Sequence, residues 1–180
     1  MQQIGISVFG SSEPEPGEPL FEKARALGRL LAEAGFCVVT GGYGGVMEGA
    51  SRGAREAGGE TLGITCELFQ QRPPNAYLSR RISTPDLHDR TRLIIERSRG
   101  YVVLDGKAGT LAELAFVWAL HRSGCLGSRP VILLDALWND LVEGLRPMLE
   151  GRALEMTHLA KTPEAALEVI RRHLPQTEAE

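Results

Sequence analysis

The sequence predicts an α/β protein in which helices cover both faces of a mainly parallel sheet of six to seven strands. Short apolar runs alternate with segments of helical period, as in parallel βαβ units. The runs are continuously apolar, which is typical of strands buried on both faces. Glycine-rich turns follow several runs, at the strand ends where such sheets bind ligands. We therefore expect one Rossmann-like, three-layer domain over residues 1–174, with a flexible tail at 175–180.

The N-terminal half alternates strand and helix in the order that this fold requires. A β-branched run at 4–9 is the first expected strand. Apolar residues at 20–34 fall on one helical face, and a glycine ends that helix. A second apolar run at 36–40 enters a glycine turn, which leads into a helix at 46–57. Two glycines close this helix, and a third strand is expected at 60–65.

The middle of the chain contains its least regular segment. Residues 66–76 include Pro-Pro-Asn and show no period, so we expect a longer loop of the kind that often covers a site. A strand is expected at 77–83 and a helix at 86–98. The apolar run at 101–104 is the next strand and enters a second glycine turn, which a helix at 110–122 follows.

The C-terminal part continues the same alternation. We expect a strand at 130–134, a helix at 138–149 and a short strand at 158–160. The last helix is expected at 162–173, because it begins with Thr followed by Pro. Threonine is a good N-cap, and proline is favoured at the first helical position.

Composition excludes several classes of function. The 180 residues carry a net charge of −3, which gives no global attraction to nucleic acid or to an anionic membrane. No apolar run approaches the roughly 18 residues of a membrane-spanning helix. Three cysteines without CxxC spacing argue against a disulfide framework or a zinc knuckle. Because the start of the chain also lacks a signal-peptide pattern, we expect a cytoplasmic protein. We expect neither a metal nor a cofactor.

Two glycine-rich turns carry most of the functional signal. The first is GGYGGVME at 41–48, and the second is DGKAGTLAE at 105–113. Each follows an expected strand and opens an expected helix, where bare backbone amides meet the positive end of a helix dipole. A third loop, GSS at 10–12, follows the first strand. Because all three lie at carboxyl ends of parallel strands, we predict one anion or nucleotide site between them.

The residues alone leave alternatives open. The first turn is neither a GxGxxG nor a P-loop motif, so a simple strand-to-helix turn also explains it. Thr110 and Glu113 fit a capping box, in which Glu113 reaches back to the Thr110 amide. Alternatively, Glu113 is a fixed carboxylate at the cleft that stabilises a sugar cation or orients water. Arg90 begins the helix before the second glycine strand and is placed to bind a phosphate.

At these positions the chain resembles the LOG family, also labelled "possible lysine decarboxylase", over nearly its whole length. The family motif PGGxGTxxE matches at Gly106, Gly109, Thr110 and Glu113. The arginine of the family's preceding helix falls on Arg90. The early glycine turn that ends in a methionine matches residues 41–47, and the first loop matches residues 10–12.

The chain departs from the family pattern at several positions. Asp105 stands where the family has proline, Lys107 where it has its second glycine, and Thr91 where it has a lysine. If the replaced glycine needs a positive φ, the loop must be reshaped around Lys107. Alternatively, Lys107 is an added phosphate ligand or a partner for Asp105. The turn at 41–48 also resembles the molybdenum-cofactor carrier branch of the superfamily.

The resemblance implies a homodimeric phosphoribohydrolase that releases the base from an AMP-like purine or cytokinin nucleoside 5′-monophosphate. It assigns catalysis to Glu113 and Arg90. The residues expected to bind the substrate are Gly10, Ser11, Ser12, Gly41, Gly42, Gly44, Gly45, Met47, Gly106, Lys107, Gly109 and Thr110. The alternative is a non-catalytic carrier of a nucleotide or a molybdopterin-type cofactor. A pyridoxal-phosphate decarboxylase is not expected, because that chemistry needs a Schiff-base lysine and only Lys107 is placed near the cleft.

Overall fold

A seven-stranded parallel sheet forms the centre of the molecule. The computed structural model describes residues 3–69 and 71–174. The strands are β1 Gly5–Phe9, β2 Cys37–Thr40, β3 Thr61–Cys66, β4 Arg80–Thr84, β5 Gly100–Val103, β6 Val131–Leu134 and β7 Thr157–Ala160. Their order across the sheet is β4-β3-β2-β1-β5-β6-β7, and each neighbouring pair is parallel. The predicted fold class is confirmed.

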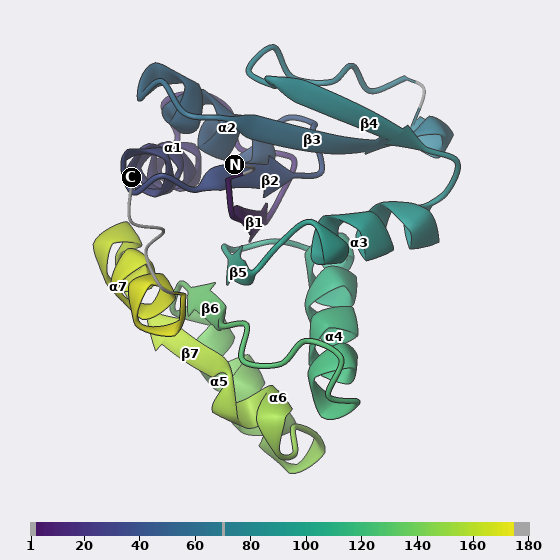
Figure 1. The fold of residues 1–180 in the computed structure, drawn as a ribbon, viewed down its shortest axis with the longest axis vertical. Coiled ribbons are helices and arrows are strands. Elements are labelled where there is room, and N and C mark those ends of the chain that lie inside the picture. Colours follow the sequence, from purple (N-terminus) through teal and green to yellow (C-terminus); the bar gives the residue numbers. More distant parts are fainter. Residues whose placement is uncertain (1–2, 70, 175–180) are drawn as a thin grey trace.

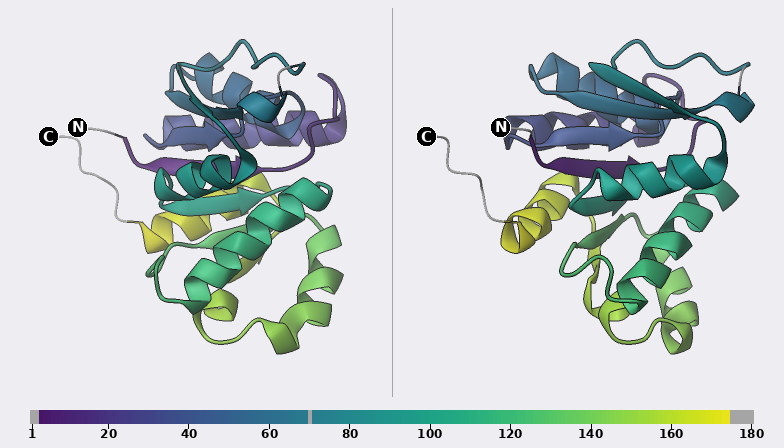
Figure 2. Two further views of the ribbon diagram at one scale, coloured as in Figure 1. Left: turned by 90° about the vertical axis from the view of Figure 1, so that its right-hand side faces the viewer. Right: turned by 45° about the vertical axis from the view of Figure 1, so that its right-hand side comes forward.

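Helices cover both faces of this sheet (Figures 1 and 2). They are α1 Pro19–Glu33, α2 Val46–Glu56, α3 Leu87–Glu96, α4 Ala108–Arg122, α5 Leu137–Leu145, α6 Arg152–Glu155 and α7 Pro163–His173. Residues of α1, α2 and α7 share one hydrophobic core with the sheet, and residues of α3, α4, α5 and α6 share the other. The molecule therefore has three layers, as the alternation of apolar runs and helical segments predicted.

The two cores follow from the alternation of side chains along buried strands. On β1, Ile6 and Val8 point toward α1 and α2, whereas Phe9 belongs to the opposite core and stacks on Tyr101 of β5. These side chains are 0–2% exposed. Fully burying such a side chain contributes about 1.5–3 kcal/mol. The central strands, and the loops that leave them, are therefore held firmly in place.

The structure differs from the predicted elements in two segments. Residues 66–76 are not wholly irregular, because Glu67–Phe69 form a 3₁₀ turn, and β4 starts only at Arg80. The helix predicted at 138–149 ends at Leu145, and α6 was missed. Pro147 explains that early end, because proline lacks an amide and clashes with the preceding helical turn.

Two predictions are not tested by the structure. The tail expected at 175–180 lies outside the described residues, and the single-domain organisation stays a prediction. Within residues 3–69 and 71–174, no helix is both long and apolar enough to cross a membrane.

The strand order places a crevice at one edge of the sheet. β1 and β5 are neighbours, yet β1 leads into α1 on one face and β5 leads into α4 on the other. The loops after these two strands therefore diverge, which opens a crevice at their carboxyl ends. Ligands of open parallel sheets bind at such a switch point.

Candidate active site at the carboxyl ends of β1, β2 and β5

A cavity of about 330 Å³ lies in this crevice. Its walls come from the loops after β1, β2 and β5, from the starts of α2 and α4, from α3, and from the segment after β3. The predicted site residues that line it are Gly10, Ser11, Ser12, Gly41, Met47, Arg90, Lys107, Gly109, Thr110 and Glu113. Gly42, Gly44, Gly45 and Gly106 do not line it. The structure thus brings most of the predicted residues together, while their roles stay predictions.

The first glycine turn is shaped by backbone requirements. Gly42 and Gly45 have φ values of 80° and 69°, in the left-handed region that favours glycine. Gly45 precedes α2, whose first amide, from Val46, donates to the Ser11 carbonyl at 2.8 Å. These glycines therefore fix the path of the turn and its contact with the β1 loop, although they do not face the cavity.

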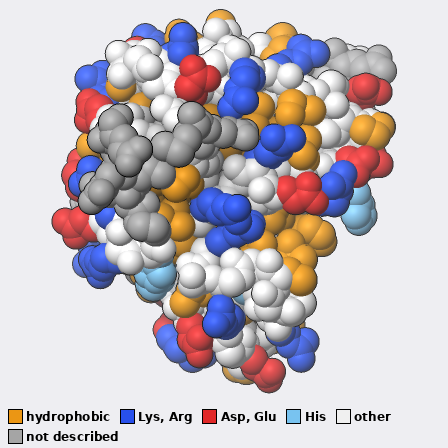
Figure 3. Space-filling view, viewed as in Figure 1, with side chains coloured by type: hydrophobic (Ala, Val, Ile, Leu, Met, Phe, Trp, Pro, Cys, Tyr) orange, Lys and Arg blue, Asp and Glu red, His pale blue; other side chains and the backbone are white. Residues whose placement is uncertain are grey.

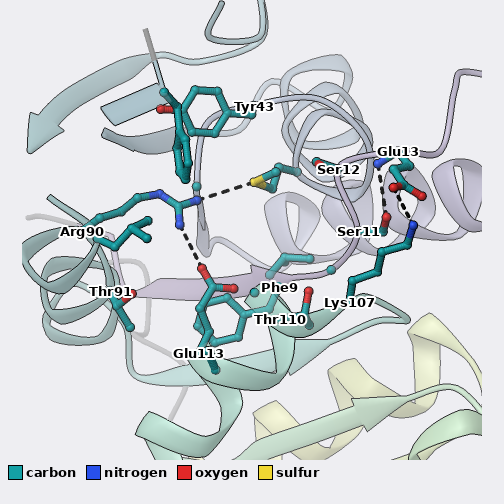
Figure 4. Close-up of a pocket in the computed structure, with 18 of the residues that line it drawn as sticks. Phe9, Ser11, Ser12, Glu13, Tyr43, Arg90, Thr91, Lys107, Thr110 and Glu113 are labelled. Carbon is teal, nitrogen blue, oxygen red and sulfur yellow. Dashed lines mark hydrogen bonds and ion pairs between the residues drawn. The ribbon is translucent and has the colours of Figure 1, made fainter. Parts of the chain in front are cut away.

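Arg90 of α3 lines the cavity, and each of its three side-chain nitrogens has a partner (Figure 4). Its Nε donates to the Ile64 carbonyl at 3.0 Å, Nη1 to Glu113 Oε1 at 3.1 Å, and Nη2 to Met47 Sδ at 3.9 Å. The guanidinium also lies 5.7 Å from the centre of the Tyr43 ring. These partners hold Arg90 in one orientation.

Gly41 makes room for this arginine. A Cβ at this position would overlap Arg90 Nη2. Any larger residue would therefore push the guanidinium out of its place between Glu113 and Met47. This is a packing reason for glycine at the end of β2, independent of any ligand.

Glu113 is a buried carboxyl that faces a buried cation. Its side chain is 14% exposed and that of Arg90 is 9% exposed. Burial raises the pKa of Glu113 above its ordinary value, and the charge and hydrogen bond of Arg90 partly oppose that rise. A carboxyl with a raised pKa beside a fixed cation is suited to proton transfer or to stabilising a developing positive charge.

The capping-box interpretation of Thr110 and Glu113 is wrong. Helix α4 begins at Ala108, so Lys107 holds the N-cap position and Thr110 lies within the first turn. Glu113 bonds to Arg90, because a buried guanidinium is a stronger partner for a carboxylate than a backbone amide. Thr110 is buried directly beneath Gly106, where a Cβ would overlap its hydroxyl. The N-cap residue Lys107 makes no side-chain cap, so the first amides of α4 have neither an intrahelical acceptor nor a capping side chain from Lys107.

The residues that depart from the family pattern fit without backbone strain. Lys107 has φ −107° and ψ −160°, so the expected reshaping around a positive φ is not needed. Its Nζ bonds Glu13 Oε1 at 2.6 Å rather than Asp105. The two loops on either side of the cavity mouth are thereby joined.

Asp105 does not line the cavity, and its backbone amide donates to Asp135 Oδ2 at 3.4 Å. Burial, and then the Asp135 carboxylate, raise the pKa of Asp105, while Lys23 opposes the rise. Lys23 forms an ion pair with Asp135 and does not line the cavity. Within the described part of the chain, no group of three or more His, Cys, Asp or Glu side chains is placed to hold a metal.

Sequence reasoning missed the aromatic wall of the cavity. Tyr43 meets Phe69 edge-on with ring centres 5.7 Å apart, and the Arg72 guanidinium lies 5.4 Å from the Phe69 ring. The Tyr43 hydroxyl accepts from the Cys66 amide at 2.8 Å, and the Tyr43 carbonyl accepts from Asn75 Nδ2 at 2.9 Å. Segment 66–76 is therefore anchored at both ends to the first glycine turn. Tyr43 carried a sequence signal because it stands inside that turn, whereas Phe69 and Arg72 were indicated only as part of the loop expected at 66–76.

Comparison with known proteins places this fold and cavity in a family. A family model described as the SLOG cluster4 family matches residues 3–166. The chain belongs to this family. An uncharacterised protein of Archaeoglobus fulgidus is 32% identical over 138 residues, covering 76% of this chain and 87% of that protein. The cytokinin riboside 5′-monophosphate phosphoribohydrolase of Mycobacterium tuberculosis is 29% identical over 169 residues, covering 92% and 87%. The resemblance to the LOG family is confirmed.

A solved structure supports the carrier branch as a second relative. The molybdenum cofactor binding protein of the phototrophic bacterium Rippkaea orientalis has a TM-score of 0.75 and 29% sequence identity to this chain. The match covers 96% of this chain and 98% of that protein. This chain thus resembles both a protein named for hydrolysis and a protein named for cofactor binding, each at 29% identity.

Proposed function

We propose that this protein hydrolyses the N-glycosidic bond of a purine or cytokinin nucleoside 5′-monophosphate, releasing free base and ribose 5-phosphate. The observation that carries the proposal is the buried Arg90–Glu113 ion pair, which lines a cavity between glycine loops. Relatives named as cytokinin riboside 5′-monophosphate phosphoribohydrolases support it.

The two ends of the cavity suit the two ends of such a nucleotide. One end is formed by Ser11, Ser12 and the start of α4, where hydroxyls and free amides suit a phosphate at the positive end of a helix dipole. Tyr43 lies away from these residues (Figure 4) and packs against Phe69, and their aromatic surfaces suit a planar base. The ribose of the bound substrate then lies beside Glu113 and Arg90.

The reaction requires the bond between ribose C1′ and the base nitrogen to break as water attacks C1′. Glu113 stabilises the positive charge that develops on the ribose and accepts a proton from the water. Arg90 donates a hydrogen bond toward the departing base, whose nitrogen takes up the electron pair of the broken bond and a proton from solvent. Glu113 releases to solvent the proton that it took from the water, so the net reaction consumes one water. Because Arg90 is already held by three partners, it needs no rearrangement to act.

The direct test is to incubate the protein with AMP and with isopentenyl-AMP and to measure the free base. We expect release by the wild type and by Glu143→Gln, which changes an exposed residue outside the cavity. Glu113→Gln is expected to lose about 100-fold or more of the rate. Full turnover by Glu113→Gln would remove Glu113 from the mechanism.

A second candidate function is a nucleotide or molybdopterin-type cofactor carrier without turnover. The replacement of a family glycine by Lys107 and the structural match to the molybdenum cofactor binding protein favour it. It predicts that a ligand raises the melting temperature while no product forms. Release of ribose 5-phosphate in a steady multiple-turnover reaction would reject it.

We also propose that the protein forms a homodimer through α4. Leu111 and Phe116 on this helix are each 39% exposed, and the small residues Ala112, Ala115 and Ala119 beside them are exposed too. Figure 3 shows apolar side chains gathered over α4, next to α3. Phe116→Asp is expected to shift the mass measured by light scattering from dimer to monomer.

We further expect the protein to work in the cytoplasm, where nucleoside monophosphates are formed and its free cysteines stay reduced.

A further inference from the structure

An ion pair that the proposed reaction does not use stands at the mouth of the cavity. Lys107 Nζ lies 2.6 Å from Glu13 Oε1, and the two side chains are 73% and 63% exposed (Figure 4). Lys107 precedes α4, and Glu13 belongs to the loop after β1. Both residues line the cavity. The pair therefore bridges the two loops that border the proposed phosphate end.

This ion pair is not needed to hold the two loops together. The Ser11 amide donates to the Asp105 carbonyl at 3.0 Å, which joins the same loops through the backbone. The Glu13 amide donates to Ser11 Oγ at 3.2 Å, which fixes the start of the Glu13 side chain independently of Lys107. Exposed ion pairs contribute little to stability, and they open readily. Lys107 and Glu13 can therefore separate without moving the backbone.

The Glu13 carboxylate occupies a place that suits another anion. It is bonded to the ammonium of Lys107, the N-cap residue of α4, and the first amides of that helix have no intrahelical acceptor. A phosphomonoester at that end would offer Lys107 two negative charges where Glu13 offers one. It would also meet repulsion from Glu13 unless that carboxylate moved away.

We propose that Lys107 is a ligand for the substrate's phosphate and that Glu13 is an internal anion that competes for it. This inference rests on the proposed function, because it takes a nucleoside monophosphate as the ligand. Binding exchanges the Glu13 carboxylate for the phosphate on Lys107. The exchange makes the site select phosphorylated ligands over nucleosides and makes Glu13 lower the affinity for them.

The proposal predicts opposite effects from the two halves of one ion pair. We would titrate AMP and adenosine by calorimetry in a Glu113→Gln background, so that the ligand is not consumed. Glu13→Gln is expected to tighten AMP binding about two- to fivefold, and Lys107→Met to weaken it about three- to tenfold. In Lys107→Met, adding Glu13→Gln is expected to change AMP binding less than twofold. Adenosine binding is expected to stay within about twofold throughout.

Glu143→Gln is the matched control. Glu143 pairs with Arg146 at 2.6 Å, its side chain is 64% exposed, and it does not line the cavity. It removes the same charge from the same kind of pair and is expected to leave AMP binding unchanged. If it tightens AMP binding as much as Glu13→Gln does, the effect is one of net charge and the proposal fails.

The remaining outcomes separate this proposal from the proposed function. If Glu13→Gln leaves AMP binding unchanged or weakens it, the competition is rejected, whether or not base is released by the wild type. An equal gain from Glu13→Gln with and without Lys107 also rejects it. If the opposite effects appear while the wild type releases no base, the competition stands and hydrolysis fails. If AMP binds to none of the proteins, both the competition at Lys107 and the proposed hydrolysis are rejected.

Discussion

Two carboxylate–cation pairs line the same cavity, one at its floor and one at its mouth. At the floor, Arg90 and Glu113 are 9% and 14% exposed, and Arg90 has further partners in Ile64 and Met47. At the mouth, Lys107 and Glu13 are 73% and 63% exposed, and among the described residues their charged groups bond only to each other. The N–O distances, 3.1 Å and 2.6 Å, would rank the pairs in the wrong order of strength.

The difference shows that burial, rather than distance, decides what an ion pair can do. Removing one partner of a buried pair leaves a charge without water or counter-ion, which costs several kcal/mol. Removing one partner of an exposed pair leaves a charge that water solvates at once. The floor pair is therefore fixed and chemically perturbed, whereas the mouth pair is exchangeable. The following variants test that contrast, from the largest expected effect to the smallest.

Breaking the floor pair should have the largest effect. Arg90→Met is expected to lower the free energy of unfolding by about 3–5 kcal/mol, because Glu113 and the Ile64 carbonyl lose their buried partner. Urea denaturation measures this loss. Adding Glu113→Leu should restore much of it, since the unpaired carboxyl is then gone. If Arg90→Met alone were as stable as the wild type, Arg90 would not be held as tightly as its contacts indicate.

The pH dependence of stability tests the environment of Glu113. Burial raises its pKa in the folded protein, so the folded state binds a proton more readily than the unfolded state does. Its contribution to stability is therefore fully present below the unfolded pKa of about 4.3 and is lost as the pH rises through the folded pKa. The difference in unfolding free energy between wild type and Glu113→Gln should fall over that range. A difference that grows with pH would mean that the attraction of Arg90 outweighs burial.

The sequence predicted the floor of the cavity better than its mouth. Periodicity placed the strands, and glycine turns at their ends brought residues 10–12, 41–47 and 106–113 to one edge of the sheet. Local rules could not decide between a capping role for Glu113 and a site role, because its partner Arg90 is 23 positions away. The pairing of Lys107 with Glu13 spans 94 positions and depends on how two surface loops approach. Such contacts have no local signal.

Phe69 should give an intermediate effect, because it connects the floor to the exterior. Its ring packs on Tyr43, which contacts Arg90, and its other neighbour is the exposed Arg72. Phe69→Ala is expected to weaken AMP binding about three- to tenfold by removing an aromatic surface for the base. Calorimetry measures it, with Leu68→Ala as control, because Leu68 is 65% exposed and does not line the cavity. Equal losses from both variants would indicate a general effect on the segment.

The mouth pair should have the smallest effect on stability. Lys107→Gly and Glu13→Gln are each expected to change the free energy of unfolding by less than about 1 kcal/mol, the usual range for exposed pairs. Lys107→Gly also adds some backbone freedom in the unfolded chain, so it should be the more destabilising of the two. Glu143→Gln, which breaks an exposed pair elsewhere, should give a change of the same size as Glu13→Gln. If Glu13→Gln instead cost as much as Arg90→Met, the ion pair would hold the loops together, and the separation of a fixed floor from an exchangeable mouth would not stand.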